Sequence, residues 1–155
     1  SDMVVPFAML LNLASVSQAE TKDTLWSFIQ RYAPGTGPDT HPGMDQAVGF
    51  AVRYYNDFVK PSKVYRLATD PEREALEALR AELVAYDGPV DDEALQSVVY
   101  AVGRERFDPL RGWFTALYEV LLGASQGPRF GGFIALYGVD ETVALIDQAL
   151  AGDLV

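Results

Sequence analysis

The residue types that most often carry out catalysis are scarce in this sequence. His41 is the only histidine, and it lies in a loop rich in proline and glycine, so we interpret it as a surface residue. With one histidine and no cysteine, the sequence offers no plausible zinc site. We identify no nucleophile among the serines. We therefore expect no catalytic residue, no metal ligand and no cofactor-binding residue in this segment.

Paired carboxylates are abundant, but they stand where helices are expected to begin. Asp70 stands before Pro71 and is expected to cap a helix, Asp91 and Asp92 follow a turn, and Asp140 and Glu141 follow a glycine. Acids in a first helical turn stabilise the positive end of the helix by about 0.3–1 kcal/mol. General acid–base catalysis instead needs two carboxylates in different environments inside a pocket. We interpret the pairs as helix caps.

Two segments could hold a phosphate group by their composition. Lys60-Pro-Ser-Lys63 resembles a phosphate-steadying loop, but it follows a helical pattern with no nucleotide-binding βα unit before it, so we expect a basic connection. The run from Gly127 to Gly132 matches no phosphate-binding fingerprint. We expect a tight turn there, with Gly131 and Gly132 allowing a close helix contact. Arg129 could bind phosphate or cap the preceding helix, and the sequence leaves both open.

The charge of the chain argues against non-specific nucleic-acid binding. The formal net charge is −10, whereas neutralising phosphates requires lysine and arginine. The charge is unevenly spread, because residues 70–93 hold nine acids against two bases and residues 53–66 hold four bases against one acid. A local basic face is therefore allowed.

The elements that must position these residues are helices. Apolar residues recur at helical spacing along nearly the whole chain, and no stretch alternates as a strand would. The clearest stripe comprises Leu110, Trp113, Phe114, Leu117, Tyr118, Leu121 and Leu122. We predict an all-α fold, a helical bundle or cage of about eight helices joined by short connections. Trp113 and Phe114 are predicted to be core residues.

The expected organisation is two helical lobes that form one unit. The first lobe covers residues 4–66 and the second covers residues 67–155, while residues 1–3 are expected to be a remnant of cloning. No apolar run, Val98–Val102 included, exceeds five residues, which is too short to cross a bilayer, and the N-terminus lacks the features of a signal peptide. We expect a cytoplasmic protein without a membrane segment.

A family resemblance enters with the last third of the chain. The run from Asp108 to Thr142 contains an aromatic helix, a Gly-Pro-Arg turn, a short aromatic helix, a glycine and a capped terminal helix, and it resembles the end of class I lysyl-tRNA synthetases. Leu95–Glu105 is similar to the preceding helix of that family, and Pro6–Ala14 to the helix that begins its anticodon-binding region. The resemblance spans residues 4–150 and is specific over residues 95–140.

The resemblance implies a role in binding rather than in catalysis. The intact enzyme would attach lysine to its tRNA with ATP in a catalytic domain that is absent here, and this segment would form the helical cage that holds the anticodon stem-loop. Its partners would be the lysine tRNA and its own catalytic domain. The candidate RNA-binding residues lie off the apolar stripes, and we expect two or three of them to touch RNA. They are Arg53, Tyr54, Lys60, Lys63, Arg66, Arg104, Arg106, Arg111 and Arg129.

The main alternative is a helical protein–protein interaction module without an RNA role, which the net charge of −10 would suit. An adapter of that kind should expose an apolar groove, whereas an anticodon-binding domain should present basic residues. A free-standing helical enzyme is a third possibility, and the lack of a catalytic constellation argues against it.

Overall fold

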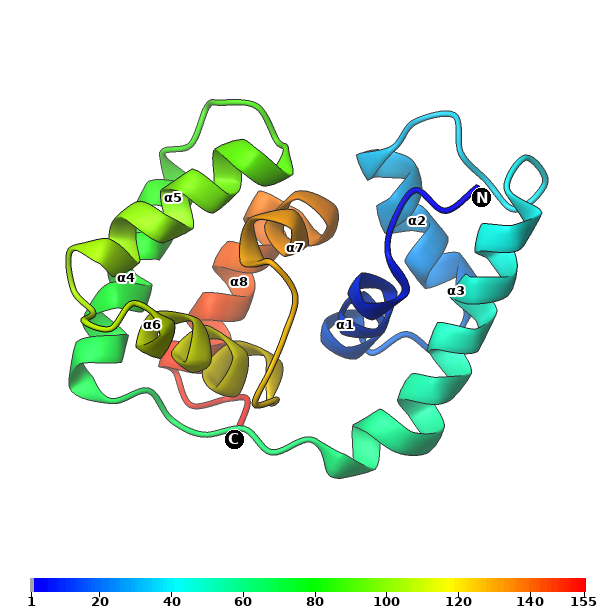
Figure 1. Ribbon diagram of the computed structural model, residues 1–155. Coiled ribbons are helices and arrows are strands. Elements are labelled where there is room, and N and C mark those ends of the chain that lie inside the picture. Colours follow the sequence, from blue (N-terminus) through cyan, green and yellow to red (C-terminus); the bar gives the residue numbers. More distant parts are fainter. Residues whose placement is uncertain (1) are drawn as a thin grey trace. The chain divides into compact units, whose positions relative to one another are not determined.

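The computed structural model describes residues 2–155 and confirms the all-helical prediction. This part of the chain forms eight α-helices and contains no strand (Figure 1). It divides into two compact units, one ending at Lys63 and one running from Val64 to Val155. In residues 2–155, no helix is both long enough and apolar enough to span a membrane.

The first unit is built from three helices around a small apolar core. Helix α1 (Phe7–Ser17) packs against α2 (Lys22–Tyr32) and α3 (Pro42–Tyr54). A π-helical turn, η1 (Tyr55–Val59), and a 3₁₀ turn, η2 (Lys60–Ser62), extend α3. The fully buried core side chains are Leu10, Leu13, Leu25, Ile29, Met44 and Val48.

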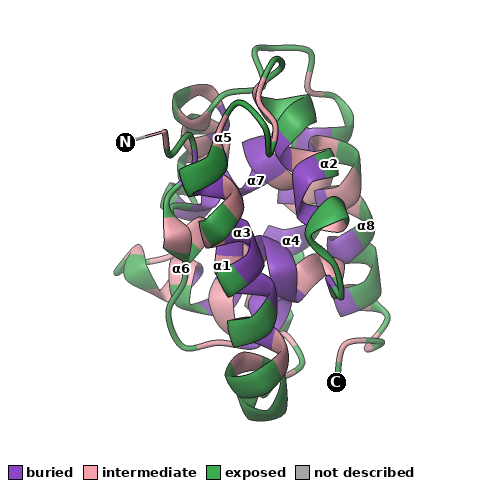
Figure 2. Cartoon of the chain, turned by 90° about the vertical axis from the view of Figure 1, so that its right-hand side faces the viewer, coloured by how far each residue is buried: buried purple, intermediate pink, exposed green. Residues whose placement is uncertain are grey.

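The second unit contains the remaining five α-helices. They are α4 (Asp70–Val84), α5 (Asp92–Arg104), α6 (Arg111–Ala116), α7 (Phe130–Tyr137) and α8 (Val139–Leu150), with a π-helical segment, η3 (Leu117–Leu122), after α6. Helix α5 packs on α7, and α4 packs on α8. Figure 2 colours the buried residues purple, and α7 is buried along most of its length. Trp113 is fully buried as predicted, whereas Phe114 is only half-buried.

The close packing of α5 and α7 depends on a glycine. A Cβ atom at Gly131 would lie 2.3 Å from the backbone nitrogen of Gln96 and 2.7 Å from the carbonyl oxygen of Asp92. The backbone N–H of Gly131 donates to Gln96 Oε1 at 2.7 Å. The prediction that Gly131 permits a close helix contact is confirmed.

Acidic residues lie at the starts of α4, α5 and α8 as predicted, but at two of these helices the capping residue differs from the predicted one. Asp91 caps α5 by accepting the N–H of Ala94, as expected. Helix α4, however, is capped by Thr69 in a reciprocal capping box with Glu72, so Asp70 is its first helical residue and not its cap. Asp140 lies in the first turn of α8, whose N-cap is Gly138.

The structure divides after Lys63, whereas the predicted lobe boundary follows Arg66. Residues 64–66 form hydrogen bonds with the second unit. The N–H of Val64 donates to the carbonyl oxygen of Gly123 at 3.2 Å, and the side chain of Arg66 bonds to Glu72 and Glu119.

Candidate nucleic-acid interface

Helix α3 and the π-helical turn η1 that extends it carry a row of exposed aromatic side chains beside their buried stripe. Phe50, Tyr54 and Phe58 follow one another at four-residue spacing, so one helix turn separates each ring from the next. Their ring centroids lie 6.1 and 5.2 Å apart, and Phe7 of α1 adds a fourth ring 5.6 Å from Phe50. We call these four residues the aromatic ladder. Phe50 is 52% exposed and Phe58 is 64% exposed, although large apolar side chains usually gain by burial.

The ladder lies beside Arg53 and Lys60, two cations without a carboxylate partner among the described residues. The guanidinium of Arg53 lies 6.0 Å from the centroid of the Phe50 ring, and no described carboxylate pairs with it. Lys60 is exposed at the end of the same helical segment and also has no carboxylate partner among the described residues. Lys63 is half-buried, and this burial lowers the pKa of its ammonium group to about 8.

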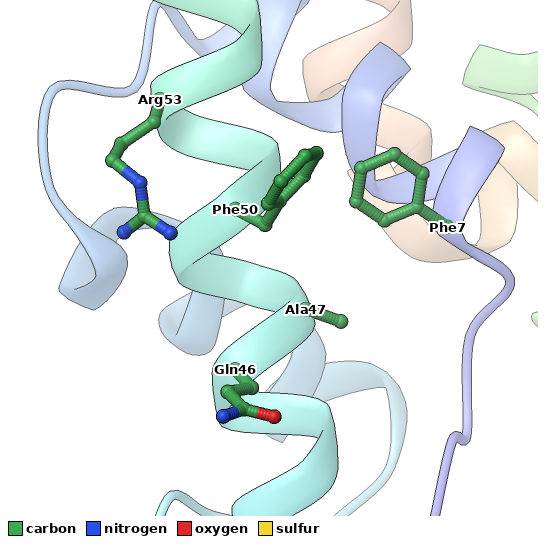
Figure 3. Close-up of a pocket in the computed structure, with 5 residues that line it drawn as sticks. All are labelled: Phe7, Gln46, Ala47, Phe50 and Arg53. Atoms are coloured by element: carbon green, nitrogen blue, oxygen red, sulfur yellow. The ribbon is translucent and has the colours of Figure 1, made fainter.

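A pocket of about 570 Å³ opens on α3 at the Phe7 end of the ladder. Its lining residues are Phe7, Gln46, Ala47, Phe50 and Arg53. Figure 3 shows the Phe7 and Phe50 rings side by side, with Gln46 one turn below Phe50 and Arg53 on the turn above it. The pocket therefore combines aromatic surface, a two-sided amide and a positive charge.

In the second unit, Arg66 is half-buried and is held by two acids. Its guanidinium donates to both carboxylate oxygens of Glu72, at 2.7 and 3.0 Å, and to Glu119 at 2.7 Å. The hydrogen bonds to Glu72 raise the pKa of Arg66, and those from Arg66 lower the pKa of Glu72. This clamp joins the segment before α4 to η3, so Arg66 has a structural task that its position in the sequence did not reveal.

Two further candidates are also engaged with acids. Arg106 lies 3.3 Å from Glu105 and 4.0 Å from Glu74, and it donates to the carbonyl oxygen of Val102. Arg129 stands at the N-terminus of α7 and forms a 3.0 Å ion pair with Asp92. These contacts are at least partly exposed, so they contribute little to stability and can be exchanged for another anion.

Arg104 and Arg111 are exposed and form no ion pair among the described residues. The Arg104 guanidinium lies 5.5 Å from the ring centroid of Tyr100, which is 43% exposed. The pair repeats on α5 the combination that Arg53 and Phe50 form on α3. Arg53 in the first unit and Arg104 in the second thus each lie over an exposed aromatic ring without a carboxylate ion-pair partner among the described residues.

Net charge differs sharply between the units. The first 63 residues contain six acids and five bases, for a net charge of −1, whereas residues 64–155 contain sixteen acids and seven bases, for −9. A polyanion is therefore repelled much less by the first unit than by the second. Of the nine candidates, Arg53, Tyr54, Lys60 and Lys63 belong to the first unit and the other five to the second.

Sequence reasoning overlooked three of the residues at these surfaces and one motif. Phe50 and Tyr100 lie off the apolar stripes, and their spacing from Arg53 and Arg104 was the available signal. Nothing in the sequence around Gln46 indicated a binding role.

Residues 123–127 do fit the spacing G-x-S-x-G. They form the turn after η3 with no strand before it, so the structural context of a nucleophile elbow is missing.

Comparisons with known proteins point in one direction. No protein-family model and no solved structure matches the chain. A curated protein of Roseobacter denitrificans named lysine–tRNA ligase is 79% identical over 154 residues, which is 99% of this chain. Proteins of the same name from Rickettsia felis and Rickettsia conorii are 40% and 39% identical over 94% of the chain. The chain spans only 28–29% of the length of these relatives. It is therefore homologous, over nearly its whole length, to part of proteins named lysine–tRNA ligase.

Proposed function

We propose that this chain is the tRNA-binding portion of a class I lysine–tRNA ligase and that it holds the anticodon stem-loop. The observation that carries the proposal is the 79% identity, over 154 residues, to a protein named lysine–tRNA ligase. The whole protein would attach lysine to its tRNA with ATP, and that chemistry would take place outside these 155 residues. The part described here would bind RNA and position it.

The exposed arginine–aromatic pairs support this role. Single-stranded loops are bound by stacking unpaired bases on aromatic or guanidinium planes and by hydrogen bonds to the base edges. Arg53 with Phe50 and Arg104 with Tyr100 offer such planes on exposed helix faces. Stacking contributes about 1–3 kcal/mol per base, which is enough for a few contacts to give useful affinity.

The partition of charge suggests which candidates contact RNA. Arg53, Arg104 and Arg111 lack carboxylate partners among the described residues, so binding a phosphate breaks no existing ion pair. Arg66, in contrast, would have to leave Glu72 and Glu119. We propose that Arg53, Arg104 and Arg111 touch the RNA and that Arg66 supports the fold.

The proposal is tested by titrating the protein with a lysine-tRNA anticodon stem-loop at low salt and again at about 0.15 M salt. A stem-loop with an altered anticodon serves as the matched control. We expect tighter binding of the lysine anticodon at both salt concentrations, because base contacts are less sensitive to salt than phosphate contacts are. Equal binding of both loops, or no binding, would refute the anticodon-binding role.

A helical protein–protein interaction module is the second candidate. The exposed aromatic ladder favours it, because a contiguous apolar surface often marks a protein interface. Under this alternative the ladder would bind another protein and the stem-loop would not bind. The same titration therefore separates the two functions.

A further inference from the structure

The pocket on α3 contains the three kinds of group that hold an extruded nucleotide. Phe50 provides an exposed ring, Gln46 provides an amide that both donates and accepts hydrogen bonds, and Arg53 provides a positive charge. The volume of about 570 Å³ lies within the range of small-molecule sites. Figure 3 shows that all three side chains arise from successive turns of one helix, so their spacing is fixed by the helix itself.

The polar groups of the pocket are not used by the fold. The Gln46 amide has no hydrogen-bond partner among the described residues, and Arg53 has no ion-pair partner there. The acid nearest to Gln46 in the chain, Asp45, is already bound, since it accepts from Lys22 and from Trp26 Nε1 at 2.9 Å. Asp45 therefore brings less uncompensated negative charge to a ligand than a free carboxylate would.

We propose that this pocket binds one unpaired nucleotide of the RNA loop. Its base stacks on Phe50, the Gln46 amide hydrogen-bonds to the base edge, and Arg53 pairs with the adjoining phosphate. The inference rests on the proposed function and deepens it, because it assigns a base-reading site to the first unit. The near-neutral charge of that unit favours it over the second unit as a place for a nucleotide.

An apolar ladder alone would suit a protein partner equally well, but the pocket residues favour RNA. A protein interface gains little from an unpaired arginine and a free amide on the same helix face unless the partner supplies matching groups. A nucleotide supplies an aromatic plane, polar base edges and a phosphate together. The exposed Phe50 ring, the Gln46 amide and the Arg53 guanidinium match these three features one by one.

The test uses lysine-tRNA anticodon stem-loops in which 2-aminopurine replaces each loop base in turn. With the unaltered protein we expect a fluorescence change at one loop position when its base moves from the loop onto Phe50. Phe50→Leu should abolish that change and weaken binding roughly 5- to 150-fold, which is the loss of one stacked base. Gln46→Ala should reduce the preference for the base at that position. Arg53→Gln should lower the salt slope by about 0.7, the value for one phosphate contact.

Matched controls lie in the same unit. Phe58→Leu removes an exposed ring of the ladder that does not line the pocket, and Arg31→Gln removes one charge from α2, where Arg31 lies over the ring of Phe28. Neither control should abolish the fluorescence change or alter the base preference. All substituted positions lie on helical segments of the first unit. Thermal melting of each variant therefore checks that this unit remains folded.

The outcomes separate this inference from the proposed function. Binding by the unaltered protein that is insensitive to Phe50→Leu, Gln46→Ala and Arg53→Gln would overturn the pocket assignment and leave the proposed function standing. Failure of the unaltered protein to bind the stem-loop would overturn both. A third outcome is that the protein dimerises without RNA and that Phe50→Leu dissociates the dimer but leaves RNA binding unchanged. That outcome would overturn the inference and make the ladder an interface between copies of the chain.

Discussion

Replacing Gly131 with alanine tests the packing that joins α5 to α7. The added Cβ would lie 2.3 Å from the nitrogen and 2.5 Å from the Cα of Gln96, and 2.7 Å from the carbonyl oxygen of Asp92. All three atoms belong to the backbone, so no side-chain rotation can relieve the overlap. The two helices must move apart, which also lengthens the hydrogen bond from the Gly131 N–H to Gln96 Oε1.

The expected cost is set by two opposing effects. Overpacking a well-packed contact costs about 1–3 kcal/mol, whereas alanine in a helix gains about 0.5–1 kcal/mol over glycine. Because rigid backbone receives the overlap, we expect the packing cost to dominate and a net loss of about 1–2 kcal/mol. Gly112→Ala is the matched control, since its Cβ would meet only Phe107 Cδ1 at 3.6 Å, an ordinary contact.

Urea denaturation followed by circular dichroism and tryptophan fluorescence measures this difference. Trp113 is buried in the second unit and Trp26 in the first, so fluorescence reports on both. For Gly131→Ala we expect a transition about 0.5–1 M lower in urea, and for Gly112→Ala an unchanged or higher midpoint. Equal stability of Gly131→Ala and the unaltered protein would refute the close helix contact.

Two further predictions concern arginines of the second unit. Arg66→Gln should destabilise the unit by about 1–2 kcal/mol at neutral pH, because Glu72 and Glu119 lose a shared charged donor. The pKa of Glu72 is lowered in the folded state, so this contribution is present above the ordinary pKa of 4.5 and is lost as the pH falls below it. Thermal melting of both proteins from pH 7 to pH 3 should therefore show a smaller decline for the variant, and parallel declines would contradict the clamp. Arg104→Gln should weaken stem-loop binding several-fold, whereas Arg80→Gln should not, because Arg80 already pairs with Asp147. Fluorescence anisotropy of a labelled stem-loop measures both, and equal effects would mean that only net charge matters.

Helix positions could be predicted because the apolar period is strong and local. Leu95, Val99 and Val102 fall on one buried face, as their spacing indicates. The cap of α4 was misplaced by one residue because Asp70 and Thr69 are both good capping residues. The deciding contact is the reciprocal bond from the Thr69 N–H to Glu72, which a pattern of residue types does not display.

The π-helical turns could not be predicted from the spacing of apolar residues. The segment Leu117–Leu122 continues an apolar stripe that fits an α-helix, but it folds with the wider π geometry and ends at Gly123, whose φ of 64° lies in the left-handed region. Residue types alone do not distinguish the two helices over one turn. The same widening follows α3 at Tyr55–Val59.

The candidate site was only partly accessible from sequence because ion-pair partners are distant along the chain. Arg66 and Glu119 are 53 positions apart, so the clamp is visible only once the fold brings them together. Exposed aromatic residues are hard to recognise for a different reason, because sequence does not show whether a ring is buried. Phe50 lies off the apolar stripes, but only the structure shows that its side chain is exposed and forms a row with Tyr54 and Phe58.

The central claim, that this chain reads the lysine anticodon, is tested most directly by competition. A complex of the protein with a labelled lysine-tRNA anticodon stem-loop is challenged at about 0.15 M salt with unlabelled lysine tRNA and, separately, with the same tRNA carrying a different anticodon. Displacement at clearly lower concentrations of the lysine tRNA is the result we predict. Equal displacement by both tRNAs would contradict the claim, because any binding would then depend on the phosphate backbone alone.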